Sequence, residues 1–230
     1  MKIIFGCFLR LALLSTCAML NFAQSPAATN AKLRATITVR MRNYAQVPSL
    51  SLARAETLAS GILREAGVQV VWLDCNVDVT TEERQSGCVQ PLGSTDFVLS
   101  LTNNLQLLSP KLTETAVGLA MVPSGGDQGY MAYISYDRAS KVARKGSVAV
   151  ETVLGLTAAH ELGHLLLGES AHSRSGIMKI FWSADELRLG LRWNMRFTPL
   201  QSERIRSNVL ARVEAFGSKQ PEVPSTRSSL

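Results

Sequence analysis

The spacing of apolar and polar residues changes several times along the chain, and each spacing predicts a different element. Apolar side chains occupy every second position of residues 33–39, which is typical of a half-buried β-strand. Short apolar runs at residues 68–73 and 96–101 predict two more strands. Residues 118–122 and 130–136 predict a further pair, because the stretch between them is rich in glycine and proline. The N-terminal half of the chain is therefore expected to supply most of a β-sheet.

Three other segments have the pattern expected of helices. Apolar residues recur at spacings of three and four over residues 52–66. Residues 147–167 carry very little charge, which predicts a buried helix that ends at Gly168. A third helix is expected after Thr198, because Thr198, the following proline and Gln201 form the signature of a capping box. This order of elements predicts an α+β domain of the α/β sandwich type.

The two ends of the chain differ in composition from the part between them. Residues 1–27 have a basic start, a long apolar run and then small residues, which is the layout of a signal peptide. Cleavage is expected after residue 27, with Ala23 as the alternative; a retained membrane anchor or a lipoprotein signal is the other interpretation. The domain is then expected at residues 28–216, secreted or periplasmic and without stable membrane insertion. Residues 217–230, rich in serine and proline, are predicted to be a disordered tail.

Charge and cysteine content limit the classes of partner and fold. The chain has 24 Lys and Arg against 18 Asp and Glu, and removal of the signal, with its two cations, leaves a mild net charge of +4 (22 − 18). These cations are scattered, so the sequence does not favour nucleic-acid binding. Two of the four cysteines lie in the signal. The other two, Cys75 and Cys88, predict one disulfide in an exported protein, with two free thiols as the alternative.

The expected buried helix carries the sequence His160-Glu161-Leu162-Gly163-His164. Histidines four positions apart lie on one face of a helix, so both imidazoles can bind a single Zn²⁺. Glu161 follows the first histidine and can take a proton from metal-bound water without being a ligand. All three histidines of the chain, including His172, lie within 13 residues, which favours a shared ligand over scattered structural roles.

The segment HELGHLLLGESAHSRSGIM resembles the metzincin metallopeptidases, whose motif is HExxHxxGxxH followed by a methionine-containing turn. The resemblance implies a twisted mixed sheet followed by an active-site helix and a C-terminal helix, with Zn²⁺ as the cofactor. It also implies a role for each matching residue: His160, His164 and His172 as metal ligands, Glu161 as the general base, Gly168 as the turning residue and Met178 as the turn methionine.

The spacing departs from the family pattern. Gly168 comes one position later than in the metzincin motif and His172 two positions later. Glu169 and the more distant Asp185 are therefore alternatives for the third ligand. No tyrosine follows Met178, so the tyrosine that some metzincins place near the metal has no counterpart.

These features predict an exported zinc-dependent endopeptidase that acts on peptide or protein substrates. The alternative is a non-catalytic zinc-binding protein, or a surface interaction protein, on the same fold. The strand expected at residues 130–136 directly precedes the helix with the histidines. It is either the edge of the sheet, where an extended peptide can add, or an interior strand.

Overall fold

The structure is a computed structural model, and it describes residues 35–75, 87–110, 112–123, 129–168, 171–189 and 195–217. The expected signal peptide, the tail after Gly217 and the alternative ligand Glu169 lie outside the described residues. Export and the limits of the domain therefore stay predictions.

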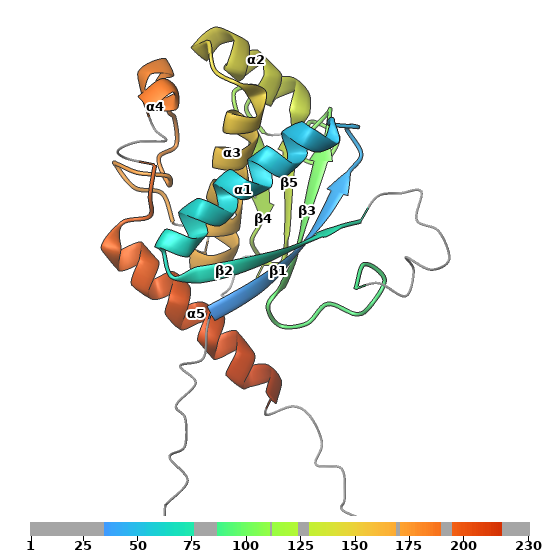
Figure 1. Ribbon diagram of the computed structural model, residues 1–230, viewed down its shortest axis with the longest axis vertical. Coiled ribbons are helices and arrows are strands. Elements are labelled where there is room, and N and C mark those ends of the chain that lie inside the picture. Colours follow the sequence, from blue (N-terminus) through green and yellow to red (C-terminus); the bar gives the residue numbers. More distant parts are fainter. Residues whose placement is uncertain are drawn as a thin grey trace, which may run out of the picture. The chain divides into compact units, whose positions relative to one another are not determined.

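Five strands form one mixed sheet (Figure 1). They are β1 (Ala35–Asn43), β2 (Val68–Asp74), β3 (Asp96–Thr102), β4 (Gly118–Met121) and β5 (Met131–Ser135). Their order in the sheet is β2-β1-β3-β5-β4, in which β4 alone runs antiparallel to its neighbour. Alternate residues of β1 are buried, as the period of two predicted. The mixed sheet with packed helices confirms the predicted α+β fold class.

The helices are α1 (Ser49–Glu65), α2 (Tyr136–Gly146), α3 (Val150–Leu167), α4 (Ala184–Leu189) and α5 (Pro199–Gly217). Helices α1 and α3 lie over the same face of the sheet, with α1 against β2 and α3 against β4 and β5 (Figure 1). Helices α2 and α5 also pack on α3, which is why its apolar residues face protein on all sides. Within the described residues, no helix has both the length and the apolar character needed to cross a membrane.

The capping box predicted at the start of the last helix is present. The Thr198 backbone N–H donates to Gln201 Oε1 over 3.0 Å, and the Gln201 backbone N–H donates to Thr198 Oγ1 over 3.3 Å. Helix α5 begins at Pro199, where the missing N–H of proline costs no intrahelical bond.

Two elements differ from what the sequence predicts. The strand expected at residues 130–136 is interior, because β4 pairs along its outer side, so the interpretation of that strand as the edge is wrong. It also ends at Ser135, whose side-chain oxygen accepts from the backbone N–H of Arg138 and so begins helix α2. Neither α2 nor the six-residue α4 was predicted.

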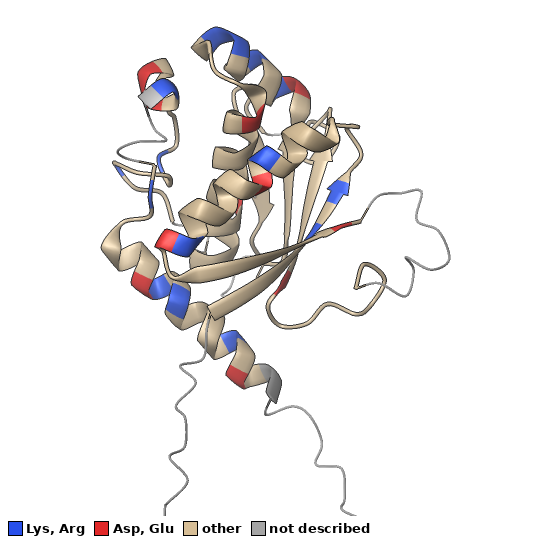
Figure 2. Ribbon diagram, in the orientation of Figure 1, with Lys and Arg blue, Asp and Glu red and all other residues tan. Residues whose placement is uncertain are grey.

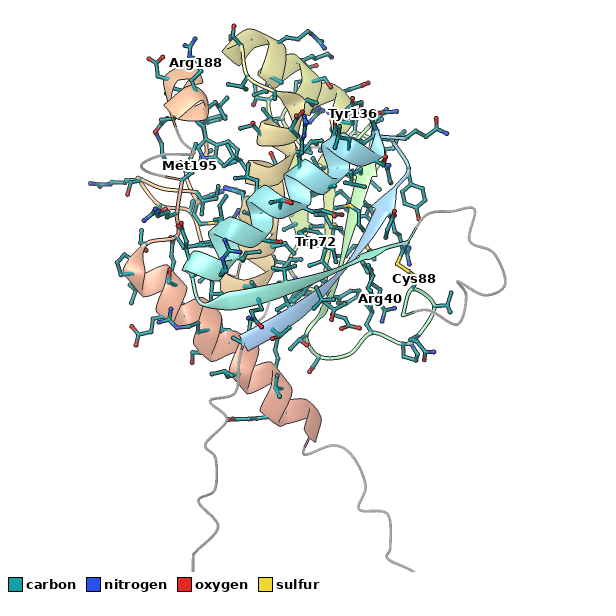
Figure 3. All side chains as sticks on the ribbon, in the orientation of Figure 1. Arg40, Trp72, Cys88, Tyr136, Arg188 and Met195 are labelled. Atoms are coloured by element: carbon teal, nitrogen blue, oxygen red, sulfur yellow. A yellow bond between two sulfur atoms is a disulfide. The ribbon has the colours of Figure 1, made fainter. Side chains whose placement is uncertain are left out.

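The predicted disulfide between Cys75 and Cys88 is present, and it appears as the yellow bond beside Cys88 in Figure 3. It joins the end of β2 to the segment that leads into β3. The buried Arg40 of β1 holds the same segment by donating to Asp96 and to the carbonyl of Pro91. Lysine and arginine residues are spread over α2, α5 and other elements, and α3 has none (Figure 2).

Candidate active site

Helix α3 and the turn after it bring the three histidines together. His160 and His164 are one helical turn apart and are about nine-tenths buried. The helix ends at Gly168, whose φ of +98° and ψ of −179° belong to a region that favours glycine. The chain then turns back, and His172 reaches the other two histidines from outside the helix.

Both neighbours of His172 are held by hydrogen bonds from elsewhere. Gln201 of the capping box donates its side-chain N–H to the carbonyl of Ala171 over 3.1 Å. The backbone N–H of Ser173 donates to the carbonyl of Met178 over 2.9 Å. The position of His172 therefore depends on both the start of α5 and the turn around Met178.

The three ring nitrogens converge on one point. Nε2 of His164 lies 3.1 Å from Nε2 of His160 and 3.1 Å from Nε2 of His172, and the three donor atoms lie within 4.8 Å of one another. Nitrogen ligands about 2.0–2.1 Å from a tetrahedral Zn²⁺ lie roughly 3.3 Å apart. The group therefore fits Zn²⁺.

The protons on these rings support the same conclusion. Nδ1 of His160 lies 2.8 Å from the carbonyl of Ile177, which can only accept, so Nδ1 carries the proton and Nε2 has a free lone pair. A neutral His164 has one proton and two Nε2 neighbours at 3.1 Å. It can point that proton at only one of them. At least one of these two contacts of His164 is therefore not a hydrogen bond, and a cation shared by the three rings would stabilise it.

The environment keeps the imidazoles neutral. The pKa of His160 and of His164 is lowered to about 4, mainly by burial and in part by the neighbouring histidines, while backbone hydrogen bonds with Ile177 and Gly168 oppose the shift. Burial also lowers the pKa of His172. Since neutral imidazole is the form that binds metal, the site is ready for a cation at neutral pH.

Met178 lies directly beneath the histidine helix. Its side chain is fully buried, and a Cβ added at Gly163, between His160 and His164, would lie 2.6 Å from its sulfur. The turn that carries Met178 also supplies the Ile177 carbonyl that orients His160. The role of Met178 as the turn methionine stays a prediction from the resemblance.

Glu161 lies in the same cavity, against the edge of the sheet. Its side chain is buried, the backbone N–H of Ala120 donates to its carboxyl group, and a Cβ at Gly118 would come within 2.3 Å of Oε1. Burial raises the pKa of Glu161 to about 8, and the hydrogen bond from Ala120 opposes that shift. A nearby cation also acts to lower it.

Strand β4 turns backbone groups outward beside this carboxylate, and the Ala120 N–H is the one bound to Glu161. The backbone N–H of Ser135 in β5 donates to the Val117 carbonyl over 2.9 Å, so residue 117 faces β5. Successive residues of an antiparallel strand alternate in direction, so the N–H and C=O groups of Gly118 and Ala120 point away from β5. The sheet edge at the site is therefore β4.

A cavity of about 410 Å³ joins these features. Its lining includes residues 112–113, 115–120 and 179–182, together with the three histidines and Glu161. The Trp182 ring meets His160 edge-on, with 5.6 Å between ring centroids. A cavity of this size can hold several side chains of a bound ligand.

Sequence reasoning placed His160, Glu161, His164 and His172, and the structure brings all four to one cavity. The alternative ligand Asp185 lies on α4 with its side chain 82% exposed and paired with Arg188, and it is not part of the group.

Several residues of the site were missed. Gly118 lies close against Glu161, and Ala120 donates its backbone N–H to the Glu161 carboxyl group. Gln201 binds the carbonyl of Ala171, next to His172. The sequence offered one signal for the contact with Glu161: Gly118 begins a predicted strand, and glycine in a strand often marks a close approach of another group.

No protein-family model matches the sequence, and no curated protein matches it. Among solved structures, archaemetzincin from Methanopyrus kandleri is similar over 76% of this chain and 97% of its own, with 20% identity and a TM-score of 0.47. A zinc-dependent peptidase from Methanocorpusculum labreanum is similar over 73% of this chain and 99% of its own, with 17% identity and a TM-score of 0.46. At this level of similarity, what the chain does has to be inferred from its own residues.

Proposed function

We propose that this protein is an exported, zinc-dependent endopeptidase. One observation carries the proposal: three neutral imidazoles converge beside a buried carboxylate in an open cavity. A purely structural zinc site needs four protein ligands and no base. Within the described residues the group has three ligand atoms, which leaves a position for water or substrate.

Each residue has a separate task in hydrolysis. His160, His164 and His172 would hold Zn²⁺, which lowers the pKa of water and polarises a carbonyl when bound. Glu161 would accept a proton from the attacking water and pass it to the nitrogen of the leaving amine. The Ala120 N–H and the close approach of Gly118 fix the carboxylate in place for both transfers.

The cavity suits an extended peptide. The outward N–H and C=O groups of Gly118 and the outward C=O group of Ala120 can pair with the backbone of a substrate laid along β4. Lys179 is the one Lys or Arg among the cavity-lining residues that the structure describes, and its Nζ lies 2.5 Å from Glu186 Oε1. Among the described lining residues no cation is therefore free to hold a substrate carboxyl terminus, which favours cleavage within a chain over removal of its C-terminal residue.

Replacing Glu161 with glutamine tests the mechanism, because glutamine keeps the shape of the side chain but cannot accept the proton. We expect E161Q to retain zinc and to lose about 10²–10⁴-fold in peptide hydrolysis. The matched variant H160A should lose zinc as well. Hydrolysis that survives in E161Q would contradict the proposal and favour the non-catalytic zinc-binding alternative.

Export is tested separately by the mass of the protein recovered outside the cytoplasm. We expect a chain that begins at residue 28 or at residue 24. A full-length product that stays with the membrane would show a retained anchor, whatever the activity of the domain.

A further inference from the structure

Part of the lining of the cavity comes from a short segment that leads into β4. We call residues 112–117 the approach segment. All of its residues except Glu114 line the cavity, and its last residue is paired with β5. The course of the approach segment therefore sets both the shape of the cavity and the point where β4 begins.

Little apolar packing holds the approach segment. Residues 113–115 are exposed, and the other three are only half-buried. Segments with few buried apolar contacts depend on their hydrogen bonds to stay in one conformation. The source of those hydrogen bonds decides how well this part of the lining is ordered.

Arg138, in the first turn of α2, supplies two of these bonds directly and a third through Gln106. Its Nη1 donates to the carbonyls of Thr113 and Ala116 over 3.0 and 2.7 Å. Its Nη2 donates to Oε1 of Gln106, and Nε2 of Gln106 donates to the carbonyl of Leu112 over 3.1 Å. Three carbonyls of the approach segment are thus bound to Arg138 directly or through one glutamine.

Arg138 has no carboxylate partner among the described residues, so its charge is directed entirely at neutral oxygens. The planar guanidinium presents several N–H groups in a fixed fork, which a lysine ammonium cannot copy. The base of the side chain is fixed as well, because the Arg138 backbone N–H donates to Ser135 Oγ over 3.3 Å. Ser135 Oγ in turn donates to the carbonyl of Asn103 over 3.1 Å.

We propose that Arg138 is a positioning residue for the peptide substrate. It orders the approach segment so that the outward N–H and C=O groups of Gly118 and the outward C=O group of Ala120 meet an extended chain next to Glu161. Arg138 does not touch the metal-binding histidines in this account, so it acts on substrate binding and leaves the metal in place. The inference rests on the proposed function for the identity of the ligand.

Two zinc-binding probes separate substrate binding from metal binding. Acetohydroxamate reaches only the metal, whereas a peptidyl hydroxamate must also lie along β4. In the zinc-loaded protein we expect R138Q to weaken the peptidyl hydroxamate about tenfold and acetohydroxamate less than about twofold. R138K should recover part of the loss. The matched control is R144Q, at an exposed arginine in the last turn of the same helix.

Equal weakening of both probes, or no weakening of either, would overturn the proposal. So would a wild-type protein that binds the peptidyl probe no more tightly than acetohydroxamate. A second test, amide hydrogen exchange of residues 112–121, needs no ligand. Exchange should be faster in R138Q than in wild type or R144Q, and unchanged exchange would also overturn the proposal. The wild type could also fail to hydrolyse peptides while it still binds the peptidyl probe more tightly than acetohydroxamate and R138Q still weakens the peptidyl probe alone. That result would contradict the proposed function and leave the role of Arg138 standing.

Discussion

Gly118 offers the sharpest test of the contact between the sheet edge and the catalytic carboxylate. An added Cβ at this position would lie 2.3 Å from Oε1 of Glu161, 2.6 Å from Cδ and 2.7 Å from Cγ. All three distances are shorter than real Cβ atoms show. The Glu161 side chain is buried and accepts from the Ala120 N–H, so relief of the clash must shift the carboxylate from this position or move the strand.

The size of the effect follows from the distances. Ordinary contact begins at 3.4 Å, so Gly118→Ala must move the carboxylate and the strand apart by about 1.1 Å, the difference between 3.4 and 2.3 Å. A displacement of that order at a catalytic group costs about 10²-fold in rate. That factor corresponds to about 2.7 kcal/mol in the activation barrier. Overpacking should cost about 1–3 kcal/mol of stability, which a domain of about 5–15 kcal/mol survives.

The assay compares peptide hydrolysis, zinc content and thermal unfolding for the wild type, Gly118→Ala and Gly61→Ala. Gly61 lies within α1, and a Cβ there meets nothing within 4 Å, so the same substitution should leave activity unchanged. We expect Gly118→Ala to remain folded and to retain zinc while kcat falls. Full activity in this variant would refute the argument that β4 fixes the position of Glu161.

Three further outcomes are expected. Gly163→Ala should lower the free energy of unfolding by about 1–3 kcal/mol and weaken zinc binding, because the new Cβ would lie 2.6 Å from the sulfur of Met178; chemical denaturation and zinc titration measure both. Replacing Cys75 and Cys88 together with serine should cost about 2–3 kcal/mol in the same denaturation assay, since the disulfide closes a short loop with a sequence separation of 13. Burial raises the pKa of Glu56 from 4.5 to about 7, so the folded state binds this proton more tightly and stability falls as pH rises from about 4.5 to 7. Glu56→Gln should therefore be more stable than wild type by about 1 kcal/mol at pH 8, after allowance for solvent screening, and equal to it near pH 4.5, in urea unfolding of the metal-free protein.

The elements that could be predicted are those with a strong local pattern. Helix α3 was predicted because its residues are apolar almost throughout, and α5 because its capping box is local in sequence. Helix α2 was missed because its buried residues are Ala139, Ala143 and Gly146, which give a weak apolar stripe among several cations. The pairing of β4 with β5 was predicted from the turn residues between them, but the order of the other strands was out of reach, since no local pattern shows which strands pair across a helix.

The site divides in the same way. The histidines and Glu161 carry side-chain chemistry at a recognisable spacing, so sequence reasoning could place them. The contact of Gly118 with Glu161 joins residues far apart in the chain and involves only backbone on one side. Arg138 acts on carbonyl oxygens, which every residue has, so no residue type in the sequence marks its partners.

Metal content tests the central claim most directly. The zinc in the dialysed protein would be measured by elemental analysis beside His172→Ala and the matched variant Asp185→Ala. The account predicts about one zinc per chain in the wild type and in Asp185→Ala, and a clear loss in His172→Ala. Absence of zinc from the wild type, or full retention in His172→Ala, would contradict the three-histidine site.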